Sequence, residues 1–328
     1  MSSYKNIWDQ FILFHSANAA QKFLYKCYIQ KERKDAKQKS YTNCYPFLYY
    51  LEHGKNFYVT AQYAPVAIKP VLLFYGMIQL LKACLLTADA DYPESTSVLA
   101  HGVSTRKRKK QGYEFLDDEV KVQKYGLFTH FSEKMFHVKQ ITGEKFQMRV
   151  LLQRISELHE LFETYYSQTL SRQVSYNPLE QTIFIPIEIL DDYHMTLDRF
   201  IDYITKEWDW LQRDSIQTEG NHIQVTSQYQ FRPLGYEPLM FNLDDGTYRL
   251  PTDRGEIFKL PEIMSHYLLL YNLSMISRYE TEWWGEFLHS YSSDAYPFIM
   301  KFLSVTAEKV PLLLYEYIFR NFNIHFST

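Results

Sequence analysis

Apolar side chains between residues 7 and 30 recur at three- and four-residue intervals, the spacing that places them on one face of an α-helix. They predict one or two amphipathic helices, and the polar run Lys31–Ser40 predicts a solvated turn after them. Lys69 and Pro70 then open a segment that is apolar on nearly every face as far as Thr87. Proline suits the first turn of a helix because the N–H group it lacks would have no partner there. We therefore predict a central, buried helix over this segment.

A second long helix is predicted from Met148 to Gln168, where apolar residues again repeat at helical spacing, and a loop is expected before it from Lys124 to Lys145. After Asn177 the pattern changes. Thr182–Ile187 has the composition of a strand, and His222–Phe231 alternates polar and apolar residues as an exposed strand would. The middle of the chain therefore passes from helices to strands.

Residues 192–211 have a helical pattern, and Phe241–Leu250 holds Asp244-Asp245-Gly246 between apolar residues, which is a hairpin signal. Helical patterns return from Pro261 onward. We expect a mainly α-helical fold with a small β element in the C-terminal half. The expected domains are a helical domain at 1–175 and a mixed region at 176–328, the latter with its β element at 180–260 and terminal helices at 261–325.

Composition narrows the class of protein. With 46% hydrophobic and 22% charged residues, the 328-residue chain has the balance of a folded protein. Its formal net charge of -3 excludes a globally basic nucleic-acid-binding protein, so any polyanion must be met by a local patch. Cys27, Cys44 and Cys84 lack the CxxC or Cys/His spacing of a metal site, and we expect buried free thiols in a reducing cytoplasm, with no metal and no cofactor.

Neither an export signal nor a membrane span is expected. The N-terminal residues lack the charged and then apolar pattern of a signal peptide. The longest strongly apolar stretch, Val71–Leu81, is shorter than the roughly 20 residues that a membrane-spanning helix needs. These features favour a cytoplasmic protein that does not contact a membrane.

The run Arg106–Lys110, here called the basic segment, is the strongest candidate for chemistry. It places five consecutive cations after Gly102, Ser104 and Thr105. Arginine and lysine bind phosphate through charge-assisted hydrogen bonds. The phosphate-site hypothesis comprises His101, Ser104, Thr105, Arg106, Lys107, Arg108, Lys109 and Lys110.

Two other interpretations of the basic segment remain open. It can be a solvated loop that is neutralised by the nearby acidic residues Glu114, Asp117, Asp118 and Glu119, or a patch that docks a protein partner. His101 can act as a general acid or base if its ring reaches a phosphate, or it can be a structural or capping histidine. Neither GxGxxG nor GxxxxGK[ST] occurs, which disfavours a nucleotide-triphosphate hydrolase of that class.

Several segments together carry a resemblance to a known family. They are Lys69–Met77, Leu81–Ala83, Leu85–Thr87, Leu99–Lys110, Phe115–Lys121, Gly126–Phe128, Leu270–Tyr279 and Trp283-Trp284. In these segments the chain resembles the YaaC-like family, and the segments extend over most of its length. The resemblance implies a shared architecture and a cytoplasmic location, but no settled activity.

A more distant resemblance is to HEPN domains, the helical nucleotide-binding and ribonuclease modules of bacterial defence and toxin systems. Leu73–Leu86 followed by Leu99-Ala-His101 is similar to their helix and histidine-containing loop. Active members carry an arginine followed a few residues later by a histidine. Arg320 and His325 fit that pattern as a catalytic pair. Arg154 and His159 also fit it, but Arg154 is expected to be structural, linked to Glu157 or Glu160.

A possible second pocket is formed by Arg278, Tyr279, Trp283 and Trp284, since bases stack on aromatic rings and guanidinium planes. The alternative is a helix-packing cluster in which Arg278 pairs with Glu280 or Glu282. The acidic pairs Asp191-Asp192 and Asp244-Asp245 lack further metal-ligand residues and are interpreted as solvated turns.

The leading functional hypothesis is a cytoplasmic, non-enzymatic YaaC-like protein that binds a phosphate-bearing ligand, RNA or a nucleotide, through residues 106–110. One alternative is a metal-independent HEPN-type ribonuclease that uses Arg320 and His325. Another is a regulatory protein that docks a partner enzyme through the basic segment. A homodimer is possible in each case.

Overall fold

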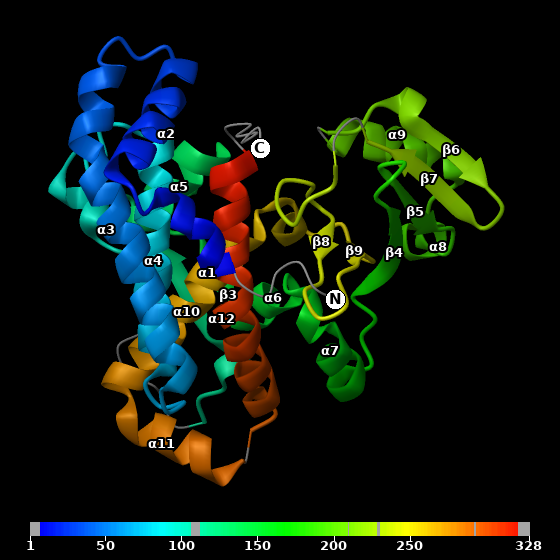
Figure 1. Ribbon diagram of the computed structural model, residues 1–328. Helices are drawn as coiled ribbons and strands as arrows, with labels where there is room; N and C mark the ends of the chain where they lie inside the picture. The colour runs from blue at the N-terminus through cyan, green and yellow to red at the C-terminus, as the bar shows by residue number, and fades with distance from the viewer. Residues whose placement is uncertain (1–6, 106–111, 209, 228–229, 292, 321–328) are drawn as a thin grey trace. The chain divides into compact units, whose positions relative to one another are not determined.

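A computed structural model of the chain describes residues 7–105, 112–208, 210–227, 230–291 and 293–320 (Figure 1). The chain forms two compact units: unit 1 combines residues 1–148 with 266–328, and unit 2 is formed by 149–265. The fold is mainly α-helical, with small antiparallel sheets mostly in the C-terminal half, which confirms the predicted fold class. A compact unit need not fold independently, as a domain does. The domains expected at 1–175 and 176–328 therefore stay a prediction.

Unit 1 is built from long helices and one small sheet. In chain order its elements are α1 Ile7–Gln10, η1 Phe11–Phe14, α2 Ala17–Gln30, α3 Ala36–Tyr63, α4 Lys69–Ala88, η2 Thr96–Leu99, β1 Val103–Ser104, η3 Phe115–Asp117, β2 Glu119–Val122, α5 Leu127–Phe136, β3 Lys145–Gln147, α10 Glu262–Tyr279, α11 Thr281–Ser290 and α12 Ala295–Arg320. The first four residues of α10, 262–265, belong to unit 2.

Unit 2 combines short helices with a larger sheet. Its elements are α6 Met148–Gln153, η4 Ser156–Leu158, α7 His159–Tyr166, β4 Ser171–Asn177, β5 Thr182–Pro186, α8 Ile189–Tyr193, α9 Leu197–Glu207, η5 Arg213–Ser215, β6 Ile216–Glu219, β7 His222–Thr226, β8 Met240–Phe241, β9 Tyr248–Pro251 and η6 Glu256–Lys259.

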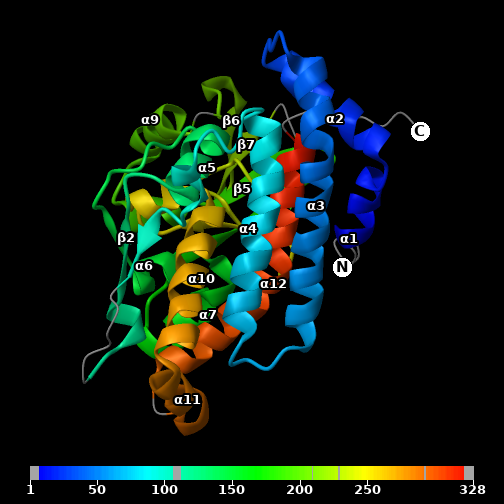
Figure 2. The same cartoon turned by 90° about the vertical axis from the view of Figure 1, so that its left-hand side faces the viewer.

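The core of unit 1 is centred on α4, which begins at Lys69 with Pro70 in its first turn, as predicted. Figures 1 and 2 show α3, α12 and α10 alongside it. Close packing of α3 on α4 depends on two glycines. A Cβ atom at Gly54 would lie 2.6 Å from Leu80 Cδ2, and one at Gly76 would lie 2.9 Å from the Tyr58 ring. These two positions therefore let the helix backbones approach each other.

Among the described residues, α4 is the one helix that is long and apolar enough to cross a membrane by length and composition. It is longer than the apolar stretch expected from the sequence, because the helix continues through Lys82 to Ala88. However, 67% of its most apolar window is buried inside the protein, which is typical of a core helix. As predicted, Cys27, Cys44 and Cys84 are buried and unpaired.

Two sequence-based expectations in unit 1 are wrong. The solvated turn expected as far as Ser40 ends earlier, because α3 begins at Ala36 and places Ser40 in the core. The loop expected from Lys124 to Lys145 contains α5, whose buried residues include Phe128 and Phe131. Asp89, just after α4, accepts a 3.0 Å hydrogen bond from His130 of this helix. This hydrogen bond links α5 to the end of α4.

The N-terminus of α5 lies against the segment that precedes the basic segment. The N–H groups of Leu127 and Phe128 donate to the carbonyl oxygens of Ala100 and His101. Gly102 and Gly126 both have positive φ, and their backbones cross so closely that a Cβ atom at Gly126 would lie 2.2 Å from Gly102 N. The first N–H groups of α5 are therefore used inside the protein.

The long helix predicted from Met148 to Gln168 is divided into α6, η4 and α7. The break comes at Arg154, whose buried guanidinium donates through Nε to the carbonyl oxygen of Leu260. Next to it, the carbonyl oxygen of Gln153 accepts a hydrogen bond from Nε2 of His159. At this break, the side chains of Arg154 and His159 therefore form hydrogen bonds with backbone carbonyl groups, and the regular helical hydrogen bonds are interrupted.

Unit 2 contains a six-stranded antiparallel sheet in the order β6-β7-β5-β4-β9-β8, which confirms the predicted β element. The predicted hairpin joins β8 to β9, with its turn at Asp244–Gly246. β7 lies between β6 and β5, and the predicted alternation is present in it, since Ile223 and Val225 are fully buried whereas His222 and Thr226 are exposed. Unit 1 has a further three-stranded sheet, β1-β2-β3, which the sequence did not predict.

Candidate functional site

The basic segment lies outside the described residues, but both of its flanks are held at one point. Thr105 Oγ1 lies 3.3 Å from Asn272 Oδ1, to which it can donate. On the other side, Tyr113 OH donates to Asp118 Oδ2 over 2.8 Å, and Asn272 Nδ2 donates to the same oxygen over 2.9 Å. Asn272 is a fully buried residue of α10. The two residues that flank the segment, Thr105 and Tyr113, are therefore both anchored through Asn272 of α10.

Two of the acidic residues near the basic segment, Asp118 and Glu119, have partners of their own. The buried carboxylate of Asp118 accepts hydrogen bonds from Tyr113 and Asn272, as described. Glu119 forms a 2.7 Å ion pair with Lys145. These two carboxylates thus contact groups outside residues 106–110. The competition expected between the acidic residues and the basic segment stays a prediction.

His101 and Ser104 occupy different environments. The His101 ring is half-buried, with ring centroids 5.2 Å from Phe74 and 5.7 Å from Tyr271. Ser104 Oγ accepts a 2.7 Å hydrogen bond from Gln123. Of the residues predicted to contact phosphate, His101 is thus placed in an aromatic environment, and Ser104 is engaged in the β1 region.

Arg278 on α10 lies near His101. Its guanidinium is half-buried, donates through Nε to the carbonyl oxygen of Ser274 over 3.0 Å, and lies 5.9 Å from the centre of the Tyr75 ring and 5.1 Å from that of Tyr279. Neither of the expected pairings, with Glu280 or Glu282, is formed. Within the described residues no carboxylate lies within ion-pair distance of this guanidinium.

A second cation without a carboxylate partner among the described residues is Lys82 of α4. Its ammonium lies 5.6 Å from the centre of the Tyr50 ring, and burial lowers its pKa. The pKa of His101 is also lowered, first by burial and then by the positive charges of Arg278 and Lys82. The three groups thus form one electrostatic cluster. We call it the cationic surface, made of His101, Lys82 and Arg278 with the rings of Tyr50, Tyr75 and Tyr279.

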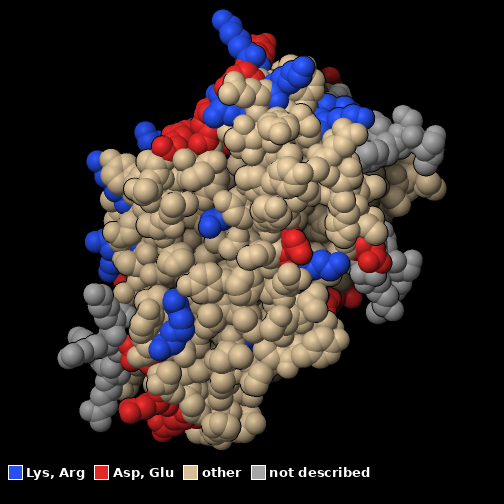
Figure 3. All heavy atoms as spheres, turned by 60° about the vertical axis from the view of Figure 1, so that its left-hand side comes forward, with Lys and Arg blue, Asp and Glu red and all other residues tan. Residues whose placement is uncertain are grey.

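Figure 3 shows the face of unit 1 that carries α3, α4 and α10. It is largely uncharged, and a few lysine, arginine and acidic side chains interrupt it. A cation on this face without an acidic neighbour is weakly screened, and it can attract a ligand of opposite charge.

The predicted second pocket is brought together only in part. Arg278 and Tyr279 contact each other, and Tyr279 is 66% exposed. The Trp283 ring lies 4.9 Å from that of Tyr113, next to the basic segment. Trp284 is buried, and its Nε1 donates to the carbonyl oxygen of Ala67 over 2.9 Å. Trp284 therefore has a packing role, whereas the other three lie near the cationic surface or the flank of the basic segment.

The two arginine and histidine pairs suggested by the HEPN resemblance have different outcomes. Arg320 is the last residue of α12, and His325 lies outside the described residues, so the ribonuclease hypothesis stays a prediction. Arg154 is structural, as expected, but its partner is Glu262 at 3.7 Å, where Glu157 or Glu160 was expected. His159 contacts Ser171 and Gln153.

Lys82 and Tyr75 were missed as candidate site residues. Lys82 is the single charged residue between Val71 and Thr87, a signal that could have identified it. Tyr75 could not be found in this way, because its contact with Arg278 joins residues 203 positions apart.

Comparison with protein families shows the family to which the chain belongs. The family model for YaaC-like proteins matches residues 12–318. No curated protein and no solved structure matches the chain. These comparisons do not show the distant similarity to HEPN domains. Because the family match extends over nearly the whole sequence, and agrees with the segments that carry the resemblance, the chain belongs to the YaaC-like protein family.

Proposed function

We propose that the protein acts in the cytoplasm, as the family resemblance implies, and that unit 1 binds a phosphate-bearing ligand, RNA or a nucleotide. The basic segment and the cationic surface would contact it. The observation that supports this most directly is the half-buried Arg278 guanidinium without a carboxylate partner among the described residues. A charge removed from water without a counter-charge is unfavourable, and a bound phosphate would supply that counter-charge.

The chemistry of the surface fits such a ligand. A guanidinium can donate two parallel hydrogen bonds to one phosphate group. Tyrosine rings provide stacking surfaces for bases, and the exposed Tyr279 is available for this contact. The basic segment adds up to five further cations, and the residues that flank it are anchored through Asn272. This arrangement supports a ligand with more than one phosphate or with phosphate and base together.

Replacement of Arg278 by glutamine is expected to weaken binding of a short single-stranded RNA or of ATP about tenfold or more, because charge-assisted hydrogen bonds contribute about 1.5–3 kcal/mol. Fluorescence anisotropy in increasing KCl measures the effect, and binding of the RNA should weaken with salt. Charge reversal at Arg106, Arg108 and Lys110 should abolish binding of the RNA and of ATP. Arg213→Gln is the matched control, since Arg213 is exposed and paired with Asp202 in unit 2.

The proposal is wrong if the native protein binds neither ligand, or if charge reversal and Arg278→Gln leave the affinities unchanged in variants with native thermal unfolding. If, instead, a protein partner is captured through the basic segment and survives nuclease treatment, the docking hypothesis is favoured.

The affinity for RNA is expected to increase as the pH falls from 8 to 5.5. The pKa of His101 is lowered by burial and by Arg278 and Lys82, and a bound phosphodiester would offset these positive charges and raise it. Binding would then take up a proton, so the affinity rises as the pH falls through the raised pKa. Phosphodiesters do not titrate in this range. Anisotropy at constant ionic strength measures the slope, and His101→Asn should remove it. An equal slope in this variant would show that another group is responsible.

A further inference from the structure

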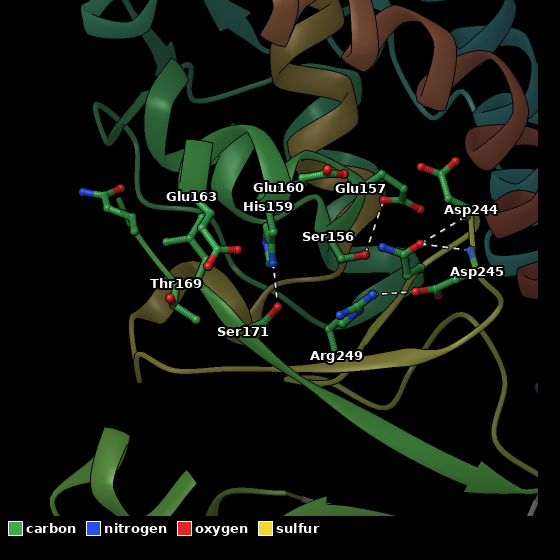
Figure 4. Close-up of a pocket in the computed structure, with 13 residues that line it drawn as sticks. Ser156, Glu157, His159, Glu160, Glu163, Thr169, Ser171, Asp244, Asp245 and Arg249 are labelled. Carbon is green, nitrogen blue, oxygen red and sulfur yellow. Dashed lines mark hydrogen bonds and ion pairs between the residues drawn. The ribbon is translucent and has the colours of Figure 1, made fainter. Parts of the chain in front are cut away.

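Unit 2 contains a pocket of about 230 Å³ at the start of α7 and β4 and beside the β8–β9 turn (Figure 4). Its polar lining combines a hydroxyl, an imidazole, an amide and a guanidinium, from Ser171, His159, Asn242 and Arg249. None of these belongs to the cationic surface of unit 1. What the pocket can do is therefore independent of the function proposed above.

Ser171 and His159 form a directed hydrogen bond in this pocket. Nε2 of His159 lies 2.8 Å from the carbonyl oxygen of Gln153, and because a carbonyl only accepts, Nε2 carries a proton and donates it. In the neutral ring Nδ1 is then the acceptor, and it lies 2.7 Å from Ser171 Oγ. The serine hydroxyl therefore donates to a base whose orientation is fixed on its far side. This is the relation between a nucleophile and its general base.

The pocket also holds donors that could stabilise an anion. Asn242 is only 5% exposed, and its Oδ1 accepts hydrogen bonds from the N–H groups of Asp244 and Asp245. The planar amide directs Nδ2 the other way, and within the described residues this nitrogen has no hydrogen-bond partner. Arg249 Nε is buried without a partner. A buried donor without a partner costs about 1–3 kcal/mol, so Arg249 Nε favours an acceptor. Asn242 Nδ2 offers a second donor to the pocket.

We propose that this pocket is an acyl-transfer site in which Ser171 is the nucleophile and His159 the general base. Ser171 Oγ attacks the carbonyl carbon of an ester, its proton moves to His159 Nδ1, and the carbonyl electron pair moves to oxygen. Asn242 Nδ2 and Arg249 Nε would donate to that oxyanion. The C–O bond to the leaving group then breaks, and the leaving alkoxide takes the proton from His159. Water, deprotonated by the same histidine, hydrolyses the acyl-serine and regenerates Ser171.

The remaining lining residues indicate the class of ester. The carboxylates of Glu160, Glu163 and Asp244 line the pocket and are exposed to solvent. Asp245 is paired with Arg249, which leaves a negative balance around the opening. An ester that carries an amine or a quaternary ammonium group fits this charge, whereas an anionic ester would be repelled.

The experiment is reaction of the full-length protein with a fluorophosphonate, which phosphonylates a serine activated by histidine. We expect one adduct by intact mass, mapped to Ser171 by peptide sequencing. Ser171→Ala should give no adduct. His159→Gln should slow labelling about 100-fold or more, because a positioned base contributes about 10²–10⁴-fold. Ser156→Ala is the matched control and should label normally, since Ser156 lines the same pocket but bonds to Glu157 and Phe241.

Two results would overturn the proposal: wild-type protein that forms no adduct, or an adduct that maps to a residue other than Ser171. Both are read from the wild-type protein, so they do not depend on whether a variant folds. Hydrolysis of acetylcholine and of its uncharged carbon isostere, 3,3-dimethylbutyl acetate, tests the ester class. The cationic ester should be cleaved with the higher kcat/KM, and equal values would reject the assigned role of the carboxylates. RNA binding by unit 1 should be unaffected in Ser171→Ala.

Discussion

Replacement of Gly126 by alanine is expected to lower the free energy of unfolding of unit 1 by several kcal/mol. Gly126 has φ of +141°, a conformation that residues with a side chain rarely adopt, and the added Cβ atom would lie 2.2 Å from Gly102 N and 2.3 Å from Gly102 Cα. Both are backbone atoms and cannot rotate away. Backbone strain of about 1–3 kcal/mol and overpacking of about 1–3 kcal/mol together remove a large part of a typical folding free energy of about 5–15 kcal/mol.

Urea unfolding followed by circular dichroism measures this effect. The control is Gly285→Ala, because a Cβ atom at Gly285 in α11 would meet no atom within 4 Å, and alanine favours helices. The control should be as stable as the wild-type protein or slightly more so. An unchanged unfolding midpoint for Gly126→Ala would show that the two backbones do not cross as described.

Removal of Arg154 is expected to cost unit 2 about 3–5 kcal/mol, the loss that follows when one partner of a buried ion pair is deleted. Arg154 is 1% exposed and Glu262 is 3% exposed, and their charged atoms lie 3.7 Å apart. Burial lowers the pKa of Arg154 despite the nearby carboxylates, which shows how strongly desolvation opposes the charge. In Arg154→Met the carboxylate of Glu262 would remain buried without this counter-charge, and the carbonyl of Leu260 would lose its donor.

A double variant separates the two causes of this loss. In Arg154→Met combined with Glu262→Met, neither charge of this pair remains, and much of the stability should return. Urea unfolding of the wild type, both single variants and the double variant forms a complete cycle. Arg213→Met is the control, because its pair with Asp202 is exposed and should contribute less than about 1 kcal/mol. Equal stability of Arg154→Met and the control would contradict the prediction.

The helices that the sequence predicted correctly have an uninterrupted signal. α4 combines Pro70 with a long apolar run, and its buried face alone would have identified it. α3 has the same kind of buried face, including Phe47 and Leu51, but its exposed side carries tyrosines at four-residue spacing. Pro46 also lies inside this helix, where proline usually breaks or kinks helical structure. Because apolar aromatic residues also lie on its exposed face, the sequence of α3 lacks the clear separation of apolar and polar faces that predicts a helix.

Other differences come from contacts that no local pattern contains. The helix expected at residues 148–168 is divided because Arg154 contacts Leu260 and Glu262, more than a hundred positions away. The candidate sites follow the same rule. The basic segment and Arg278 were found because each is conspicuous in the sequence itself. The pocket of unit 2 was not, since it brings His159 and Ser171 together with Asn242 from a distant hairpin.

The discontinuous composition of unit 1 affects how the protein can be made. α4 packs on α12, yet 232 residues separate the last residue of α4, Ala88, from the last residue of α12, Arg320. At about 5–20 residues per second, a ribosome needs roughly 12 to 46 s to cover that distance. During this interval the most apolar helix of the nascent chain lacks a neighbour that later buries it. We therefore expect α4 to be covered by α3, or protected by a chaperone, until α12 has been synthesised.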